Sequence, residues 1–394
     1  MKHLLNLTLL ASVAMALPAL AATKPPIVIG ASIAQTGPAS SLGAGEVIAM
    51  NMLARQINDQ GGIDGHPLKL IIQDSGSDPQ KDVLNVRKMI TGDHAVGIIC
   101  CTTSPESLAI IDTVQRAKVP NISLAASATI VQPAAERHWI FKTPPLDSTM
   151  VGAEVQDMKA RGIKTVGFIG FSDAYGKGGL DEFKKAAKPA GIQITNTEQF
   201  ARTDTNVSAQ AAKLVSANPQ AVLIWAIPPG ANVAQKALLD AGYKGAIYQS
   251  YGVTNETFLR LGGDSLNGTR TSALPVIVYD HLSDALPFKS TVEKFVADYK
   301  AASGGSVPSS FAGHGYDAVL ILTHVAGDVL KGGKVKLSDT AAFRAALRSG
   351  IENLKNFQAV DGTFNFSKDD HVGLGPTSAV MITFENGKYQ PLEH

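Results

Sequence analysis

The residue types used in catalysis are present in this chain, but they form no familiar catalytic motif. The sequence holds no G-x-S-x-G nucleophile turn and no H-E-x-x-H zinc motif. His314 has the most suggestive surroundings of the nine histidines, yet a helix-entry or surface position explains it better than catalysis. Asp173, Asp181 and Glu182 are typical of helix-start charges and solvated faces. The sequence therefore predicts neither an enzyme nor a metal site.

Cofactor and nucleic-acid binding are not predicted either. Gly43-Ala44-Gly45 comes nearest to a phosphate-binding loop, but it lacks the full dinucleotide pattern and the lysine of a P-loop. The 394 residues include 35 basic and 34 acidic side chains, so the net charge is +1. Such a chain has no basic excess to hold nucleic acid. We expect no cofactor, no metal and no nucleic-acid partner.

Small polar residues at 102–104 offer a different chemistry, which is anion binding. They follow the apolar run AVGIIC and precede Pro105, where a strand would lead into a helix. Hydroxyls and backbone N–H groups at such a place can hold an anion without a cation. Alternatively, Thr102 and Thr103 simply cap the helix.

Cys100 and Cys101, the two cysteines of the chain, are adjacent in sequence. An oxidising compartment favours a disulfide. A bond between neighbours would close a strained eight-membered ring, so we expect two free thiols or small core residues.

The first 22 residues predict export. Lys2 and His3 form a short basic start, an apolar run follows over 4–17, and Ala19-Leu20-Ala21 has the form of a cleavage site. The apolar run is too short for a mature membrane-spanning helix, and no cysteine follows that could carry a lipid. We expect a mature protein that is not membrane-spanning and works in the periplasm.

Apolar runs alternate with amphipathic segments from residue 27 onward. The pattern predicts strands over 27–33, 68–74, 95–100 and 120–125, and Asp78-Pro79 supplies an N-cap and a first-turn proline for one of the intervening helices. After Pro144-Pro145 the rhythm restarts, with strands over 165–171, 192–200, 221–227 and 246–250. We therefore expect two α/β lobes, each with a parallel sheet covered by helices on both faces, and a cleft between them.

The last third of the chain is less regular. The extended run 269–279 carries Pro275, which favours a crossover over a central strand. Helices over 291–301, 316–329 and 340–350 then suggest a return to the first lobe. Asn386-Gly387 between two apolar runs predicts a β-hairpin.

An ordered series of segments resembles the branched-chain amino-acid type of periplasmic substrate-binding protein, the Leu/Ile/Val-binding-like component of an ABC importer. The series comprises ASIAQTGPASSLGAG, INDQGGIDGHPLKLIIQDSGSDPQ, IICCTTSPE, VPNISLAAS, FSDAYGKGG, LLDAGYKG and YGVTNETFLRLGG. It covers essentially the whole mature chain. The resemblance implies a type I periplasmic-binding fold without enzymatic activity, in which two lobes joined by three crossovers close on a ligand. It also implies a monomer that meets ABC transporter membrane permease subunits.

The resemblance further implies domain boundaries. The first lobe would hold residues 23–144 and about 279–358, and the second lobe residues 145–274 and about 364–394. Hinge crossovers would lie near 142–147, 273–279 and 358–364.

The same resemblance implies the ligand contacts of the first lobe. The residues matching the family's carboxylate and amino contacts are Cys101, Thr102, Thr103, Ala125 and Ser127. Cys101 stands where the family often has a hydrogen-bonding serine. Leu42 matches a side wall that a larger aromatic often fills.

In the second lobe, Tyr175 matches a tyrosine that closes over the ligand, although it could also be a surface residue. Pro228 falls where an aromatic residue commonly sits, and Trp225 nearby could supply aromatic surface or belong to the core. Tyr251 replaces the acidic residue that usually pairs with the α-ammonium group. A buried ammonium without that partner would cost several kcal/mol. The substitution favours a ligand with a carboxylate and no free α-ammonium, such as an aromatic or other small organic acid.

Other interpretations remain open at this point. The chain could bind leucine, isoleucine, valine or another amino acid through hydroxyls and carbonyls. It could also be a periplasmic sensor domain for a signalling partner, since both roles use one fold. A secreted hydrolase is the remaining alternative, and turnover lost on Thr102→Ala would indicate it.

Overall fold

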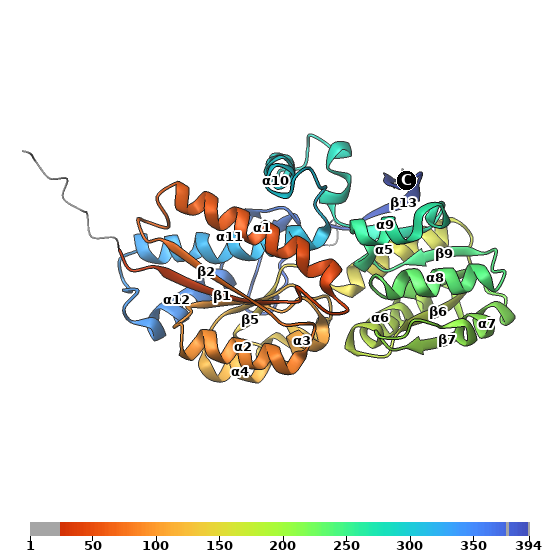
Figure 1. Cartoon of the computed structure of the whole chain (residues 1–394), viewed down its shortest axis with the longest axis horizontal. Helices are drawn as coiled ribbons and strands as arrows, with labels where there is room; N and C mark the ends of the chain where they lie inside the picture. Colours follow the sequence, from red (N-terminus) through yellow and green to blue (C-terminus); the bar gives the residue numbers. More distant parts are fainter. Residues whose placement is uncertain (1–23, 376–377, 393–394) are drawn as a thin grey trace, which may run out of the picture.

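The protein is described here by a computed structural model covering residues 24–375 and 378–392. The expected leader, residues 1–22, lies outside these residues. Figure 1 shows two lobes side by side, one coloured red to orange with light blue, the other yellow to green. Each lobe is built around its own sheet with helices on both faces. The predicted two-lobed α/β fold is confirmed.

The sheet of the first lobe has five parallel strands in the order β2-β1-β3-β4-β5. They are β1 (Ile27–Ile33), β2 (Leu68–Asp74), β3 (Gly97–Cys100), β4 (Asn121–Ser123) and β5 (Ile140–Lys142). The central strands β3 and β4 are buried at every position because helices cover both faces.

Four helices alternate with these strands, namely α1 (Ser40–Asp59), α2 (Pro79–Thr91), α3 (Ser104–Ala109) and α4 (Ile111–Ala117). The predicted cap of α2 is confirmed, because the Asp78 side chain accepts the N–H of Gln80 at 2.8 Å. The single helix expected over 105–117 is instead two short helices, α3 and α4.

The sheet of the second lobe has seven strands in the order β14-β13-β10-β9-β8-β6-β7. They are β6 (Thr165–Phe171), β7 (Gln193–Phe200), β8 (Ala221–Trp225), β9 (Ala246–Gln249), β10 (Arg270–Ala273), β13 (Val380–Glu385) and β14 (Lys388–Pro391). Its helices are α5 (Asp147–Ala160), α6 (Ala174–Ala190), α7 (Ser208–Ser216), α8 (Gly230–Asp240) and α9 (Glu256–Gly262).

Two expectations for this second sheet need correction. The sheet is not wholly parallel, because β13 runs antiparallel to both β10 and β14. The Asn386-Gly387 hairpin is confirmed, with both turn residues at positive φ. The run 269–279 was expected to lie outside the sheet centre, yet its first part forms β10 between β9 and β13. Pro275 ends that strand and begins the short 3-10 helix η5 (Pro275–His281).

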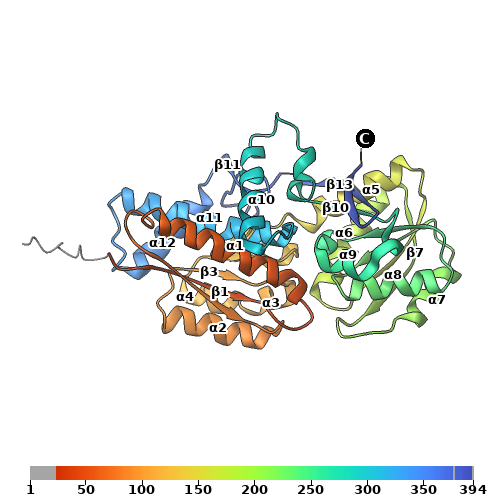
Figure 2. The same ribbon diagram turned by 45° about the horizontal axis from the view of Figure 1, so that its top comes forward.

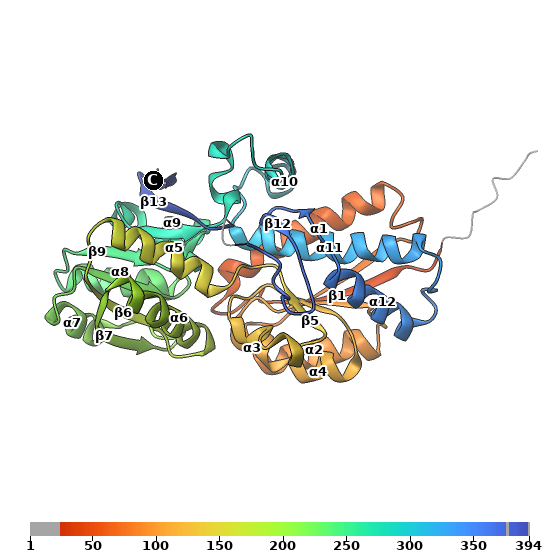
Figure 3. The same cartoon turned by 180° about the vertical axis from the view of Figure 1, so that it is seen from behind.

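The chain passes between the two sheets three times: after β5, after β10 and before β13. After the second passage come α10 (Lys289–Ser303), α11 (Ser310–Lys331) and α12 (Thr340–Glu352). Helix α11 packs along α1, so the chain returns to the first lobe as predicted. Figure 3 shows the late strand β13 on the lobe that carries α5 and β9.

The remaining elements are short. Strands β11 (Phe357–Gln358) and β12 (Thr363–Phe364) pair with each other, and the other 3-10 helices are η1 (Ala128–Ile130), η2 (Ala134–Glu136), η3 (Tyr251–Val253) and η4 (Gly263–Leu266). Within residues 24–375 and 378–392, no helix combines the length and apolar character that crossing a bilayer requires.

Candidate ligand-binding site

A small cavity lies between the two lobes. In the first lobe its lining residues are Leu42, Thr102, Thr103, Ser104, Leu124, Ala125, Ala126 and Phe311. In the second lobe they are Tyr175, Arg202, Ile227, Tyr251 and Gly252. Most of these residues follow the carboxyl end of a strand, which is where α/β sheets bind ligands. The cavity volume is about 20 Å³, room for about one water molecule.

Six of the nine residues predicted from the resemblance share this cavity. They are Leu42, Thr102, Thr103, Ala125, Tyr175 and Tyr251. The structure brings together segments that are far apart in sequence, and Leu42 packs with the hydrophobic core of the second lobe. Their contact with a ligand remains a prediction.

Cys101, Ser127 and Pro228 do not line the cavity. The Ser127 hydroxyl shares a hydrogen bond of 2.9 Å with Thr129 Oγ1. The Pro228 carbonyl accepts from Ser41 Oγ at 3.3 Å, and Pro228 lines a separate open groove on the surface. Because each faces other groups, this arrangement gives them no direct contact with the cavity.

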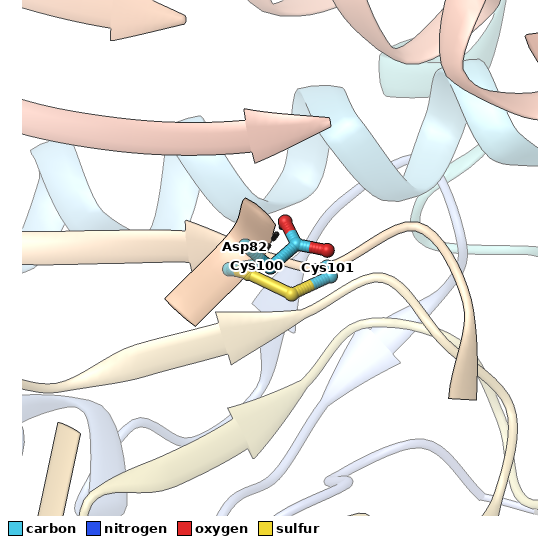
Figure 4. Close-up of side chains that lie close together, drawn as sticks. All are labelled: Asp82, Cys100 and Cys101. Atoms are coloured by element: carbon cyan, nitrogen blue, oxygen red, sulfur yellow. Dashed lines mark hydrogen bonds between the residues drawn. A yellow bond between two sulfur atoms is a disulfide. The ribbon is translucent and has the colours of Figure 1, made fainter. Parts of the chain in front are cut away.

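Cys100 and Cys101 form a disulfide, so the expectation of free thiols is wrong. Both residues are fully buried, and Figure 4 shows the Asp82 carboxyl beside the sulfur–sulfur bond. Asp82 Oδ1 lies 3.6 Å from Cys100 Sγ, but a disulfide sulfur carries no proton to donate. The possible ligand atoms of these three side chains lie close enough together to share a metal ion. Cysteine, however, binds a metal only as the thiolate. The oxidised pair therefore does not fit a metal ion.

The threonine hydroxyls are already engaged inside the first lobe. Thr103 Oγ1 and the Thr103 N–H both donate to Glu106 Oε2, at 2.5 and 3.1 Å. Thr102 Oγ1 accepts the N–H of Ala34 at 3.1 Å and donates to Glu46 Oε2 at 2.7 Å. For Thr103 the helix-capping interpretation holds, because its donors join it to the first turn of α3. Neither hydroxyl is presented freely to a ligand.

Two tyrosines of the second lobe close the cavity. The Tyr175 hydroxyl donates to Ser250 Oγ at 2.9 Å, and the ring packs 5.7 Å from that of Trp225. Trp225 itself is fully buried, so the core interpretation is the right one for it. Tyr251 is only 2% exposed. Burial raises the pKa of both tyrosines well above the usual value, so both remain neutral.

Arg202 also lines the cavity, although the resemblance did not point to it. It follows the end of β7, and its Nε donates to Asp173 Oδ2 at 2.5 Å. The guanidinium carbon lies 4.5 Å from the centre of the Phe171 ring. Its Nη1 is buried and has no hydrogen-bond partner among the described residues. The position of Arg202 after a parallel strand was a usable indication, because ligand sites lie at that edge.

The described lining of the cavity holds one charged group, and the carboxylate that pairs with it, that of Asp173, stands outside the lining. Among its described residues, Arg202 is the one with a charged side chain, and none carries a carboxylate. Two buried carboxyl groups, those of Glu46 and Asp147, lie behind the cavity lining. Burial raises the pKa of Glu46 to about 8 and that of Asp147 to about 7, and neither residue lines the cavity. Both Asp147 oxygens lack hydrogen-bond partners among the described residues.

His314 lies near the start of α11, as the helix-entry interpretation expected, but it is not a surface residue. It is fully buried within α11, and its Nδ1 lies 2.6 Å from Asp361 Oδ2. Burial lowers the pKa of His314 to about 3, and the nearby Lys142 contributes to the same effect. The pair joins α11 to the segment before β12, and His314 does not line the cavity between the lobes.

A family model described as periplasmic binding protein matches residues 26–388, nearly the whole chain. The chain belongs to the periplasmic binding protein family. It is 25% identical to the Leu/Ile/Val-binding protein homolog 3 of Brucella melitensis, over 99% of this chain and 100% of that protein.

Solved structures of this family have the same architecture. An extracellular ligand-binding receptor from Rhodopseudomonas palustris HaA2 is 34% identical, with a TM-score of 0.87 over 94% of this chain and 100% of that chain. A branched-chain amino acid transporter substrate binding protein from Streptococcus pneumoniae, solved in complex with isoleucine, is 21% identical. Its TM-score is 0.78 over 93% of this chain and 98% of that chain, which shows a shared fold. These comparisons confirm the resemblance and identify a periplasmic binding protein of the kind that serves ABC transport systems.

Proposed function

We propose that this periplasmic binding protein captures a small organic acid in the periplasm and delivers it to the membrane permease subunits of an ABC importer. The observation that carries this proposal is the charge of the cavity. Its described lining includes the Arg202 guanidinium, the neutral Tyr251 and no carboxylate. An α-ammonium group would be buried there without a carboxylate partner in the described lining, at a cost of several kcal/mol. A carboxylate without an ammonium avoids that cost.

Ligand entry requires the lobes to move apart. A cavity of about 20 Å³ has no room for an organic acid, so the present arrangement corresponds to a nearly closed state. Hydrogen bonds that join the lobes include Ser41 Oγ to the Pro228 carbonyl at 3.3 Å and Thr254 Oγ1 to Ser310 Oγ at 3.0 Å. We infer that the three passages between the sheets act as the hinge. A bound solute would stabilise the closed state, which the permease would recognise.

Amino-acid binding is the second candidate. The Brucella relative is named a Leu/Ile/Val-binding protein homolog, and the buried Asp147 offers a carboxyl behind the cavity. A Cβ added to Gly178 would lie 3.6 Å from Asp147 Oδ2 and 3.5 Å from Ser127 Oγ, so Asp147 lies near the boundary between the lobes. If an amino acid is the solute, Asp147→Asn should abolish its binding.

A thermal-shift panel tests the proposal. It compares aromatic and aliphatic acids with amino acids at matched concentrations. A solute at 100 times its dissociation constant stabilises the folded state by about 2.7 kcal/mol. We expect stabilisation by one or more acids and none by leucine, isoleucine or valine. A strong shift with leucine and none with any acid would establish the second candidate instead.

A further inference from the structure

We propose that Arg202 of the second lobe, rather than the threonine hydroxyls of the first lobe, binds the carboxylate of the solute. This inference rests on the proposed function, because it requires the solute to be an acid. It reverses the expectation from the sequence, where residues 102–104 formed the anion site.

Two contacts hold Arg202 in place, one with Asp173 and one with Phe171. Nε donates to Asp173 Oδ2, and the guanidinium carbon lies over the Phe171 ring. Asp173 is itself fixed, because its Oδ1 accepts the N–H groups of Tyr175 and Gly176 at the start of α6. Nη1 is buried and has no hydrogen-bond partner among the described residues, and Arg202 is part of the cavity lining. A buried guanidinium N–H that lacks an acceptor is costly, and a carboxylate is the acceptor that best matches its geometry.

The threonine hydroxyls of the first lobe are already engaged with other groups of that lobe. Both donors of Thr103 go to Glu106, and the hydroxyl of Thr102 goes to Glu46. The N–H of Ala125 donates to Ser123 Oγ at 3.2 Å. The hydroxyls that the sequence suggested as anion ligands therefore hold the first lobe together.

The rest of the lining indicates the body of the solute. The apolar side chains around the cavity are Leu42, Leu124, Ile227 and Phe311, together with the rings of Tyr175 and Tyr251. Such a wall suits an apolar or aromatic skeleton. The solute class that follows is a small monocarboxylic acid whose carboxylate points toward the second lobe. Its charge would then be met only when that lobe closes over it.

Calorimetric titration of the full-length mature protein with an acid and its primary amide tests the inference. Suitable probes are 3-phenylpropanoate with 3-phenylpropanamide, and 4-methylpentanoate with 4-methylpentanamide. We expect wild-type protein to prefer the acid, and Arg202→Gln to weaken acid binding by at least about 30-fold while changing amide binding little. Arg202→Lys should restore part of the preference. Arg116→Gln, on an exposed helix face, should leave both affinities unchanged.

The outcomes separate the two proposals. If wild-type protein binds no acid in the thermal-shift panel or here, the proposed function fails and this inference fails with it. If wild-type protein prefers acids and Arg202→Gln keeps the same acid-to-amide ratio, only this inference is overturned. If Thr102→Val, with Arg202 intact, no longer prefers the acid over the amide, the carboxylate binds to the first lobe and this inference is likewise overturned. Urea midpoints within the wild-type range show that each variant is folded.

Discussion

Asp173 and Arg202 form an ion pair of 2.5 Å at the edge of the cavity, where β6 and β7 end. The same carboxylate caps α6, because its other oxygen accepts the Tyr175 N–H at 2.9 Å. The Asp173 side chain thus holds both the Tyr175 backbone and the Arg202 guanidinium in place. Tyr175 and Arg202 therefore form one jointly fixed part of the cavity lining.

Replacing Asp173 should separate its role as the N-cap of α6 from its role as the ion-pair partner of Arg202. Asp173→Ser keeps an N-cap hydroxyl but cannot pair with Arg202, whereas Asp173→Ala removes both. We expect the alanine variant to lose about 1 kcal/mol of unfolding free energy and the serine variant much less. Both should weaken acid binding several-fold, because Arg202 is no longer held. Urea unfolding and calorimetry measure the two effects, and a serine variant with wild-type acid affinity would show that Arg202 needs no positioning partner.

Tyr251 should control the choice between acids and amino acids. Tyr251→Glu places a carboxylate at the cavity, which repels an acid and offers a partner to an α-ammonium group. We expect acid binding to fall by at least about tenfold and amino-acid binding to appear or strengthen. Tyr251→Phe serves as the matched control, because it keeps the ring and adds no charge. If the glutamate variant keeps the wild-type preference in a thermal-shift panel, Tyr251 is not the discriminating residue.

Glu154 should make the stability of the second lobe depend on pH. It is fully buried; one oxygen accepts Ser272 Oγ at 2.7 Å and the other has no partner among the described residues. Burial raises its pKa to about 8, above the unfolded value of 4.5. The stability that this group contributes is therefore complete below pH 4.5 and is lost as pH rises toward 8.

Glu154→Gln removes that dependence. The unfolding free energy of the variant relative to wild type should rise with pH, by up to about 1.4 kcal/mol per pH unit within this window. Urea unfolding at pH 5, 6.5 and 8 measures the difference. Glu136→Gln, at an exposed position, is the control and should show a constant difference. A constant difference for Glu154→Gln as well would show that Glu154 ionises normally.

The disulfide between Cys100 and Cys101 should be detectable chemically. Urea-unfolded protein without reductant should take up no iodoacetamide, and reduced protein should gain two adducts by mass spectrometry. Because the closed loop is the shortest one, reduction should cost only about 1 kcal/mol of unfolding free energy. Cys100→Ala/Cys101→Ala is the control, whose stability should not respond to reductant. Two adducts without reduction would disprove the bond.

The alternation of strands and helices could be read from the sequence because apolar periodicity depends on burial. The first strands of both lobes, the cap at Asp78 and the Asn386-Gly387 turn all follow local rules. Strand β10 could not be recognised in that way. The proline at 275 argued against a strand, but it stands just beyond the last residue that pairs with β13.

The site was predictable in its location and less so in its chemistry. The resemblance placed Leu42, Thr102 and Tyr251 around one cavity. It did not show that Thr102 and Thr103 satisfy buried acids of their own lobe. The spacing from Thr103 to Glu106 is that of a capping box, so this pair was readable from the sequence. Glu46 becomes a neighbour of Thr102 only through helix packing. Arg202 was overlooked because an arginine after a strand is usually a solvated charge, and only the pairing with Asp173 turns it inward.

The central claim is that the solute is an acid without an α-ammonium group. Isothermal titration of matched pairs tests it most directly: 4-methylpentanoate against leucine, and 3-phenylpropanoate against phenylalanine. Each pair shares one skeleton and differs by the amino group alone. We predict that at least one acid binds about 100-fold or more tightly than its amino acid, as expected for an ammonium buried without a partner. An amino acid that binds as tightly as its acid, or more tightly, would contradict the claim.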